Sequence, residues 1–244
     1  MLDIQLPNCQ VNTAQDSDIF THDGLNFALH PYVFSPKKND SSAFFAQGLI
    51  SQNLTGSLIE IGSGCGLVGL TVTEKCRLTS LTATDINPFA VLCTRENSER
   101  LGLGDRVSVY EGDVYDPIPA QKAHAIFWNA PWVSRGRLKQ GHVELTRVQR
   151  SFFDPGYQGL KKYISLARDY LVPDGRLFLG FGKGANTDGM FHIAREHGYE
   201  PCVIRKKQDE TKGNVSKFIL YELKRPSTKK TQRGNLLETP AFAG

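Results

Sequence analysis

The sequence predicts an α/β fold with a mostly parallel seven-stranded sheet, an antiparallel hairpin at one edge and helices on both faces. Two observations support this prediction. From residue 57 onward, short apolar segments alternate with segments of helical character, which is typical of a parallel sheet covered by helices. A glycine-rich turn at residues 62–66 follows the first apolar segment, as at the carboxyl end of a parallel strand. The 244 residues are enough for one such domain with a sizeable core.

The main domain is expected over residues 53–225. Its expected strands are 57–61, 80–85, 106–111, 123–128, 176–181, 200–206 and 215–223, and its expected helices are 67–77, 88–101, 159–171 and 187–197. An irregular basic insert, residues 133–153, separates the fourth strand from the third helix. The Pro-Asp-Gly sequence at 173–175 predicts a turn before the fifth strand, and a charged loop joins the last two strands into the edge hairpin.

The two ends of the chain have a different character. Residues 1–52 are expected to form an N-terminal lead-in that packs on the core. Within it, alternating apolar residues at 25–36 predict a small β-hairpin beside the main sheet, and a run of polar residues predicts the start of a helix over 43–51. Residues 226–244 are rich in Lys, Thr, Gly and Pro, which predicts a disordered basic tail.

Charge and cysteine content narrow the classes of function. The net charge is +4, but five basic residues and one acidic residue within 224–244 account for it, so the remaining chain is neutral. A neutral body disfavours nucleic-acid binding dominated by phosphate contacts. Five scattered cysteines without a C-x-x-C pair, and six histidines without metal-ligand spacing, predict reduced cytoplasmic thiols and no metal site. Neither a signal peptide nor an apolar run of about 18 residues occurs, so no membrane association is expected.

The stretch at residues 57–69 carries the main functional signal. Glycines there permit positive φ and close approach of a ligand, and the next helix begins with unpaired N–H groups, so the stretch predicts a nucleotide-type cradle. Residues 64–69 contain G-x-G-x-x-G, and Asp85 lies about twenty residues further on, as in a dinucleotide-binding fold. In a dinucleotide-binding fold, however, the first glycine of the fingerprint ends the strand, and here that glycine is Gly62. Counted from Gly62, the third glycine would fall at position 67, which is a leucine.

Counted from Glu60, the turn reads acidic-x-Gly-x-Gly-x-Gly, which resembles motif I of the class I S-adenosylmethionine-dependent methyltransferases. The resemblance implies that the turn binds S-adenosyl-L-methionine. Glu60 is expected to order the turn or the methionine amino group. The turn residues expected to contact the cofactor are Gly62, Ser63, Gly64, Cys65 and Gly66.

Two further acidic residues lie where such a cofactor needs hydrogen-bond acceptors. Asp85 ends the second strand and is followed by Ile86 and Asn87, and its carboxylate can accept hydrogen bonds from both ribose hydroxyls. Alternatively, Asp85 only caps the next helix. Gly112-Asp113-Val114 closes the third strand, where the Asp113 carboxylate can receive the adenine amino group. Alternatively, this segment is an ordinary turn.

Asn129-Ala130-Pro131-Trp132 follows the fourth strand and forms the expected acceptor site, with Asn129 also contacting the cofactor. Methyl transfer from a sulfonium is an in-line displacement, and an amide or exocyclic amino nitrogen must be oriented because its lone pair is delocalised. The Asn129 side-chain oxygen and the Ala130 carbonyl can each accept one N–H, and Trp132 can stack on a planar acceptor. Proximity and electrostatic complementarity then supply the main contributions, and no strong general base is needed.

With these motifs the chain resembles the class I methyltransferases that carry an Asn-Pro-Pro-Tyr-type motif, particularly the protein-glutamine N-methyltransferases that modify translation release factors. The resemblance implies a Rossmann-like fold, S-adenosyl-L-methionine as cofactor and an amino-type acceptor. Ala130 and Trp132 stand where that family has proline and tyrosine, so the acceptor pocket is altered. The matching stretches are 33–36, 60–66, 85–87, 129–132, 154–160 and 173–175.

Three hypotheses for the function remain open. The first is an S-adenosylmethionine-dependent N-methyltransferase acting on an amide, amine or exocyclic amino group of a small molecule or protein, with nucleic acid as a less favoured acceptor. The second is a methyltransferase-fold binding module without turnover, suggested by the altered Ala130 and Trp132. The third is a nicotinamide oxidoreductase, which rests on the glycine spacing at 64–69 alone.

Overall fold

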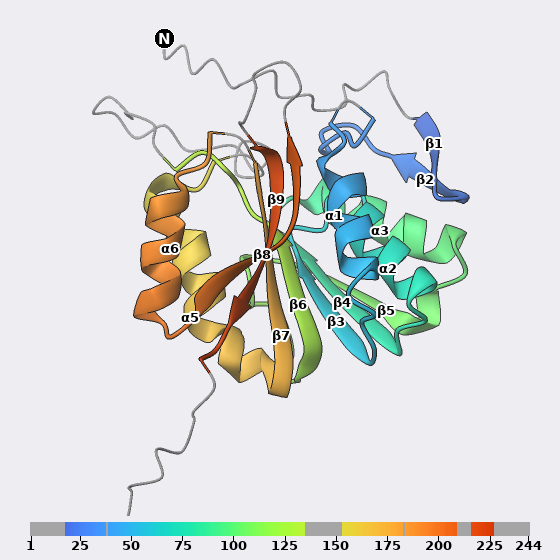
Figure 1. Cartoon of the computed structure of the whole chain (residues 1–244). Coiled ribbons are helices and arrows are strands. Elements are labelled where there is room, and N and C mark those ends of the chain that lie inside the picture. Colours follow the sequence, from blue (N-terminus) through green and yellow to red (C-terminus); the bar gives the residue numbers. More distant parts are fainter. Residues whose placement is uncertain (1–17, 38, 135–152, 183, 209–215, 227–244) are drawn as a thin grey trace, which may run out of the picture.

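A seven-stranded sheet forms the centre of the protein in the computed structural model (Figure 1). The structure describes residues 18–37, 39–134, 153–182, 184–208 and 216–226. The strand order is β5-β4-β3-β6-β7-β9-β8; neighbours from β5 to β7 are parallel, and β9 is antiparallel to both β7 and β8. The mostly parallel sheet with an antiparallel edge hairpin is thus confirmed. The strands are β3 (Ser57–Ile61), β4 (Ser80–Asp85), β5 (Val107–Glu111), β6 (Ala123–Asn129), β7 (Leu171–Gly182), β8 (Glu200–Gln208) and β9 (Ser216–Lys224).

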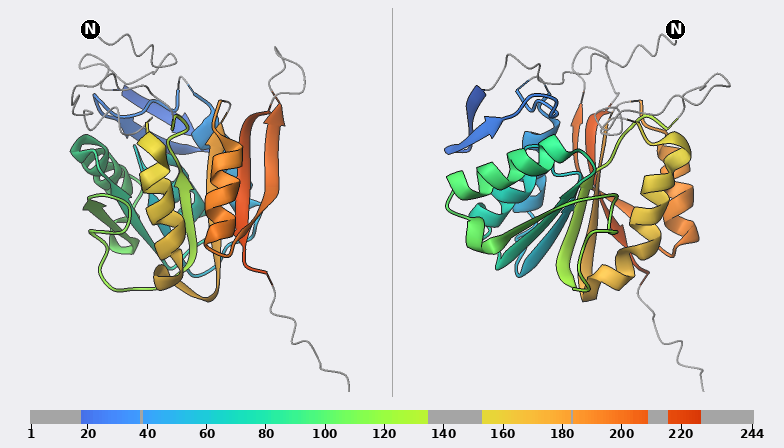
Figure 2. Two further views of the ribbon diagram at one scale, coloured as in Figure 1. Left: turned by 90° about the vertical axis from the view of Figure 1, so that its left-hand side faces the viewer. Right: turned by 180° about the vertical axis from the view of Figure 1, so that it is seen from behind.

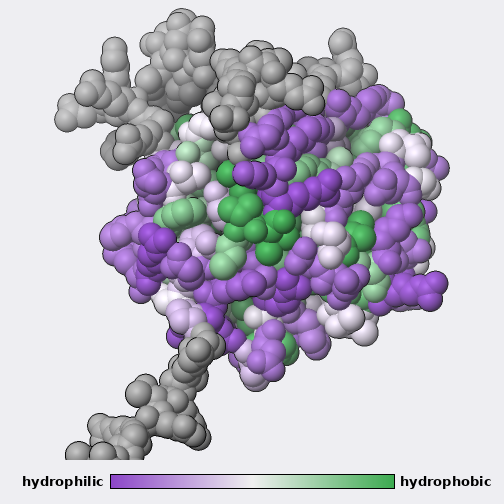
Figure 3. Space-filling model, in the orientation of Figure 1, coloured by the Kyte–Doolittle hydropathy of each residue, from purple (hydrophilic) through white to green (hydrophobic). Residues whose placement is uncertain are grey.

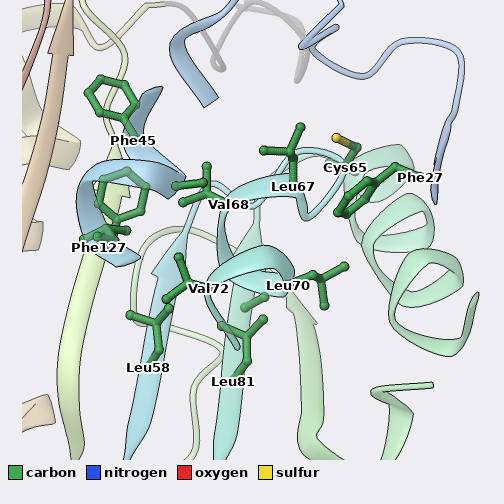
Figure 4. Packing of buried hydrophobic residues seen from close by; sticks show 14 of the residues in the cluster. Phe27, Phe45, Leu58, Cys65, Leu67, Val68, Leu70, Val72, Leu81 and Phe127 are labelled. Atoms are coloured by element: carbon green, nitrogen blue, oxygen red, sulfur yellow. The ribbon is translucent and has the colours of Figure 1, made fainter. Parts of the chain in front are cut away.

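Helices cover both faces of the sheet, as expected (Figure 2). The helices are α1 (Ser41–Ile50), α2 (Leu67–Lys75), α3 (Pro88–Arg100), α5 (Gln158–Tyr170) and α6 (Thr187–Glu196), with short 3-10 helices η1 (Gly104–Arg106) and η2 (Pro155–Tyr157). One apolar cluster joins the sheet to α1, α2 and α3, and Figure 4 shows Phe45 of α1 and Val68 of α2 facing Phe127 and Leu58 of the strands. A second cluster joins the other face to α5 and α6.

Strand β6 shows how the sheet divides its side chains between these clusters. Successive side chains of a strand point to opposite faces. Accordingly Ala125 and Phe127 belong to the first cluster, whereas Ile126 and Trp128 belong to the second. Trp128 therefore lies on the face that α5 covers, while Asn129 follows it at the end of the strand.

The N-terminal hairpin lies earlier in the chain than expected. It consists of β1 (Asp18–His22) and β2 (Leu25–Leu29), joined by Asp23 and Gly24, both with positive φ. An Asp-Gly pair at positive φ is the favoured two-residue hairpin turn. The prediction that placed the hairpin at 25–36 is therefore wrong, because 18–22 supplies the first strand. The β2 strand packs on α3.

The expected turn at 173–175 lies within β7. Between Ala123 and Ala125 of β6, strand β7 advances from Leu171 to Arg176, so the extra residues bulge out of the ladder. Pro173 has no N–H to donate, which suits a position outside the ladder. The Pro-Asp-Gly sequence therefore marks a bulge inside a longer strand and not a turn before a strand.

The polar residues before α1 act differently from the expected helix caps. Asp40 occupies the N-cap position without a capping hydrogen bond. Its carboxylate instead accepts hydrogen bonds from Lys207 of β8 and from Lys217 of β9, the latter at 2.7 Å. Asn39 Oδ1 accepts a hydrogen bond from the Ser41 N–H at 3.0 Å. The start of α1 is thus attached to the edge hairpin.

The surface in the orientation of Figure 1 is largely hydrophilic, with a group of hydrophobic side chains near its centre (Figure 3). No helix in the described part of the chain is long and apolar enough to span a membrane. Most of the basic insert and the C-terminal tail (135–152 and 227–244) lie outside the described residues, so their expected character stays a prediction.

Arg176 links the edge hairpin to the rest of the sheet and gives a test of stability. Its guanidinium donates to both carboxylate oxygens of Glu222 at 2.7 and 3.0 Å, and to Gln52 Oε1 at 2.9 Å. We expect Arg176→Met to lower the free energy of unfolding by about 2 kcal/mol in urea titrations, because Glu222 is nine-tenths buried and loses its main partner. Arg195→Met, which breaks the exposed pair with Glu200, is the control and should change nothing measurable. Equal effects of the two variants would contradict the prediction.

Candidate active site

A cavity of about 590 Å³ lies at the carboxyl edge of the sheet, where β3, β4, β5 and β6 end. This is the position at which ligands bind open α/β sheets, and the volume is typical of small-molecule sites. The structure brings together every residue expected at the site except Gly66, which does not line the cavity. The expected residues that line it are Glu60, Gly62, Ser63, Gly64, Cys65, Asp85, Ile86, Asn87, Gly112, Asp113, Val114, Asn129, Ala130, Pro131 and Trp132.

The glycine turn has the backbone conformation that its sequence requires. Gly62, Gly64 and Gly66 have φ values of 65°, 60° and 80°, in the left-handed region that favours glycine. Gly66 is the N-cap residue of α2. A Cβ at Gly64 would meet nothing within 4 Å, so this part of the turn faces open space. A ligand can therefore approach the backbone closely at Gly64.

Two polar side chains of α3 donate hydrogen bonds to backbone carbonyls of the glycine turn. Thr94 Oγ1 donates a hydrogen bond to the Gly64 carbonyl at 3.0 Å. Asn97 Nδ2 donates to the carbonyls of Cys65 and Ala28, both at 2.8 Å, and Asn97 Oδ1 accepts from the Ala28 N–H at 2.7 Å. Sequence reasoning missed both residues, whose only signal was a polar side chain within a helix. Through Asn97 the glycine turn is connected to strand β2 of the N-terminal hairpin.

Glu60 orders the start of α2, whereas its expected role in ordering the glycine turn or the methionine amino group stays a prediction. Its Oε2 accepts a hydrogen bond from the Gly69 N–H at 3.0 Å, and a Cβ at position 69 would collide with the same oxygen. Burial raises the pKa of Glu60 to about 8, and nearby Asp85 adds to the increase. Gly69 is therefore required by the buried carboxyl group, and this explains the glycine that had suggested a dinucleotide fingerprint.

The raised pKa of Glu60 predicts a pH-dependent stability. The folded protein holds a proton on Glu60 up to about pH 8, whereas the unfolded chain releases it near the ordinary pKa of a glutamate, 4.5. The contribution of Glu60 to stability is therefore present below about pH 4.5 and is lost as the pH rises through about 8. We expect Glu60→Gln, which keeps an acceptor for the Gly69 N–H, to flatten this decline in thermal unfolding curves between these pH values. A slope as steep as that of the wild type would contradict the assignment.

Asp85 joins the glycine turn to the following helix. Its Oδ2 accepts a hydrogen bond from the Gly64 N–H and its Oδ1 from the Asn87 N–H, each at 2.9 Å. Burial raises the pKa of Asp85 to about 6. The N-cap of α3 is Asn87, whose Oδ1 accepts from the Phe89 N–H at 3.1 Å, so Asp85 is not the helix cap. An ionised carboxylate has about four lone-pair positions, so these two bonds leave capacity for a ligand.

The segment after β5 lies beside Asp85, because the Gly112 N–H donates to the Asp85 carbonyl at 3.0 Å. Val114 has a left-handed φ of 54°, and its carbonyl accepts from Thr84 Oγ1 at 3.0 Å. The half-exposed Asp113 carboxylate pairs with Lys162 of α5 at 3.1 Å. This ion pair was not expected from the sequence, and the adenine-binding role of Asp113 stays a prediction.

Asn129 has an oxygen that lacks a donor. Asn129 Oδ1 is buried and has no hydrogen-bond partner among the described residues, although Asn129 lines the cavity and pairs with Gly180 in the sheet. Leaving a buried acceptor unpaired costs about 1–3 kcal/mol, and such an atom in a native protein calls for an explanation. A ligand that donates an N–H provides one.

Trp132 forms a wall of the same cavity. Its ring lies against Gly182 of β7, where any Cβ would collide with it, and its centroid is 5.6 Å from that of Phe218 in β9. One part of the indole is therefore fixed by the sheet. Stacking of Trp132 on an acceptor stays a prediction.

Asp154 is a site residue to which sequence reasoning gave no role. Its carboxylate accepts from the N–H groups of Gly159 and Leu160 at 3.0 and 2.9 Å, in the first turn of α5, and its own N–H donates to the Val133 carbonyl at 3.0 Å. Asp154 thus connects the segment after β6 to α5. Phe34, Asn39 and Ser42 of the N-terminal region also line the cavity without having been expected there. The sequence signal that could have identified Asp154 is its place in residues 154–160, one of the stretches that resemble the methyltransferase family.

The description of the family whose model matches residues 24–186 is "Methyltransferase small domain". The chain belongs to this family. It is 27% identical over 174 residues to the release factor glutamine methyltransferase of Geobacter sulfurreducens, covering 69% of this chain and 60% of that protein. It is 26% identical to the ribosomal protein uL3 glutamine methyltransferase of Burkholderia pseudomallei, covering 68% of this chain and 53% of that protein. The chain thus spans between half and two thirds of the length of these relatives.

Two solved structures confirm the Rossmann-like methyltransferase fold. The 16S rRNA N2 G1207 methyltransferase of T. thermophilus, in complex with AdoMet and guanosine, matches with a TM-score of 0.61 at 15% identity, covering 86% of this chain and 50% of that chain. The ribosomal protein L11 methylase of Lactobacillus delbrueckii subsp. bulgaricus matches with a TM-score of 0.56 at 15% identity, covering 81% of this chain and 83% of that chain.

The cofactor of this family member is S-adenosyl-L-methionine, and the residues present fit it. The turn exposes backbone at Gly64, and Asp85 retains acceptor capacity beside it. Asp113 offers a second carboxylate on the same cavity. These groups suit a ligand with ribose hydroxyls and an adenine amino group to donate.

Proposed function

We propose that this protein is an N-methyltransferase that transfers the methyl group of S-adenosyl-L-methionine to an amide, amine or exocyclic amino nitrogen. The observation that carries the proposal is the buried Asn129 Oδ1, which lines the cofactor cavity and has no partner in the described part of the chain. A substrate whose methyl-accepting nitrogen carries an N–H can donate a hydrogen bond to this oxygen. A substrate that is methylated on carbon and has no hydroxyl group cannot.

The chain itself has to orient the acceptor. When bound, the cofactor supplies an electrophilic methyl group. The Asn129 oxygen and the Ala130 carbonyl each accept one N–H of the acceptor, which turns the nitrogen lone pair toward the cavity. Because these acceptors are fixed at the end of β6, they stabilise positive charge developing on nitrogen without reorganising. None of the described residues that line the cavity is Lys, Arg or His, which suits an uncharged acceptor.

The acceptor class that we favour is a side-chain amide of a protein. Support comes from the relatives, whose names state that they methylate glutamine in release factors or in a ribosomal protein. The described cysteines are free thiols, and we expect the enzyme to work in the cytoplasm.

The decisive experiment is transfer of labelled methyl groups to fractionated cytoplasmic protein, RNA and metabolites, with mass spectrometry of the labelled product. N-methylglutamine or another N-methyl product is expected in the protein fraction. Methyl groups on carbon or oxygen alone would overturn the proposal, whereas an N-methyl product in RNA or a metabolite would correct only the acceptor class.

A binding module without turnover is the second candidate, because Ala130 and Trp132 differ from the motif that the chain resembles. It predicts S-adenosyl-L-methionine binding with no methyl transfer to any fraction. The nicotinamide hypothesis has lost its support, since Gly69 is explained by its contact with Glu60.

A further inference from the structure

The indole of Trp128 is held between two glycines at the edge of the cavity. A Cβ at Gly62 would lie 2.9 Å from Trp128 Nε1, and a Cβ at Gly159 would lie 3.1 Å from Trp128 Cη2. The N–H edge of the indole therefore points toward the glycine turn, and the six-membered ring points toward the first turn of α5. All three residues line the cavity.

The indole N–H has no acceptor in the described protein. Trp128 is 7% exposed and lines the cavity, and among the described residues no acceptor is bonded to its Nε1. Its ring neighbour Tyr163, with centroids 5.3 Å apart, uses its own hydroxyl on the Phe178 carbonyl at 2.5 Å. Nε1 is not among the buried polar atoms that lack a partner, so it is open to the cavity, where a bound ligand can supply an acceptor.

The chemistry of the cavity indicates which ligand group this is. Asp85 and Asp113 are hydrogen-bond acceptors and so suit the donors of S-adenosyl-L-methionine, namely its hydroxyl and amino groups. The carboxylate of its methionine moiety needs donors instead. No described lining residue is Lys, Arg or His, so the donors that the described part of the cavity offers to this carboxylate are neutral N–H groups.

We propose that the Trp128 Nε1–H donates a hydrogen bond to the carboxylate of the cofactor's methionine moiety. Trp128 is then a cofactor-positioning residue, adjacent in sequence to Asn129. The inference rests on the assignment of S-adenosyl-L-methionine as cofactor, but it does not depend on which acceptor is methylated.

Calorimetry of Trp128→Phe with two ligands tests the proposal. S-adenosylhomocysteine keeps the carboxylate, whereas 5′-methylthioadenosine lacks the whole amino-acid moiety. We expect the variant to bind S-adenosylhomocysteine about tenfold more weakly and 5′-methylthioadenosine unchanged, since only a hydrogen bond to a charged group is lost. Equal weakening for both ligands would show that Trp128 only packs, and no weakening for either would also overturn the proposal.

Nuclear magnetic resonance of the wild type avoids the risk that the variant folds poorly. The chain contains two tryptophans, so Trp132→Phe assigns the remaining indole N–H signal to Trp128. Saturation with S-adenosylhomocysteine should shift this signal downfield, and 5′-methylthioadenosine should not. An unmoved signal in the S-adenosylhomocysteine complex overturns this inference alone. Failure of the wild type to bind S-adenosylhomocysteine overturns the inference together with the cofactor assignment.

Discussion

Asn129→Ala is expected to lower kcat by about 100- to 1000-fold, the effect of removing one oriented hydrogen-bonding group from a transition-state site. Cofactor affinity should stay within about threefold of the wild type, because the main proposed cofactor contacts lie on the glycine turn and at Asp85. Stability should not fall, since the substitution removes a buried oxygen for which the described residues provide no partner. The measurements are single-turnover methyl transfer, calorimetry with S-adenosylhomocysteine and thermal unfolding.

This combination of readouts separates the proposed role from a structural one. A structural asparagine would lose stability and activity together when truncated. Full turnover by Asn129→Ala, with an acceptor identified by the labelling experiment, would contradict the acceptor-orienting role. Asn186→Ala is the control, because the Asn186 side-chain oxygen accepts a hydrogen bond at the start of α6 and Asn186 does not line the cavity.

Asp85→Ala is expected to weaken cofactor binding by about 100-fold, through loss of charged hydrogen bonds to the ribose. The substitution also releases the Gly64 and Asn87 N–H groups, which Asp85 now holds in place. Calorimetry with S-adenosylhomocysteine measures the effect. Asp116→Ala is the control, because Asp116 carries a carboxylate on the surface that pairs with Lys162 and should leave affinity unchanged. Equal affinities of Asp85→Ala and the wild type would contradict the assignment.

The same carboxylate predicts how binding depends on pH. Burial raises the pKa of Asp85 to about 6, so part of the population is protonated in mildly acidic solution. A protonated carboxyl has less capacity to accept hydrogen bonds from ribose hydroxyls. Affinity for S-adenosylhomocysteine should therefore fall as the pH drops below about 6, and Asp85→Asn should remove this dependence. If the affinity of Asp85→Asn still fell below about pH 6, the titrating group would be a residue other than Asp85.

The strands that carry the site were the most predictable part of the fold. Both β3 and β4 have the expected bounds, because a buried parallel strand followed by a glycine or acidic residue has a clear sequence signal. The first strand of the hairpin was missed, since residues 18–22, which precede the Asp23-Gly24 turn, are too polar to indicate a strand on their own. The bulge in β7 was missed because a Pro-Asp-Gly sequence does not distinguish a turn between elements from a bulge within one.

The candidate site was predictable where it depends on topology. Residues that follow parallel strands meet at one sheet edge, so Asp85, Asp113 and Asn129 could be placed together from sequence order. Contacts between distant side chains could not be predicted. Neither the Glu60–Gly69 hydrogen bond nor the packing of Trp128 between two glycines leaves a periodic pattern in the sequence.

Asn97 gives the N-terminal hairpin a thermodynamic connection to the glycine turn. Its one amide group binds Ala28 of β2 and Cys65 of the turn, so a change of position in either strains the same hydrogen bonds. Coupling of this kind is reciprocal: a molecule that stabilises the docked hairpin strengthens ligand binding at the turn by the same factor by which that ligand strengthens the docking. The hairpin is thereby coupled to the cavity through Asn97, although no residue of 18–29 lines the cavity.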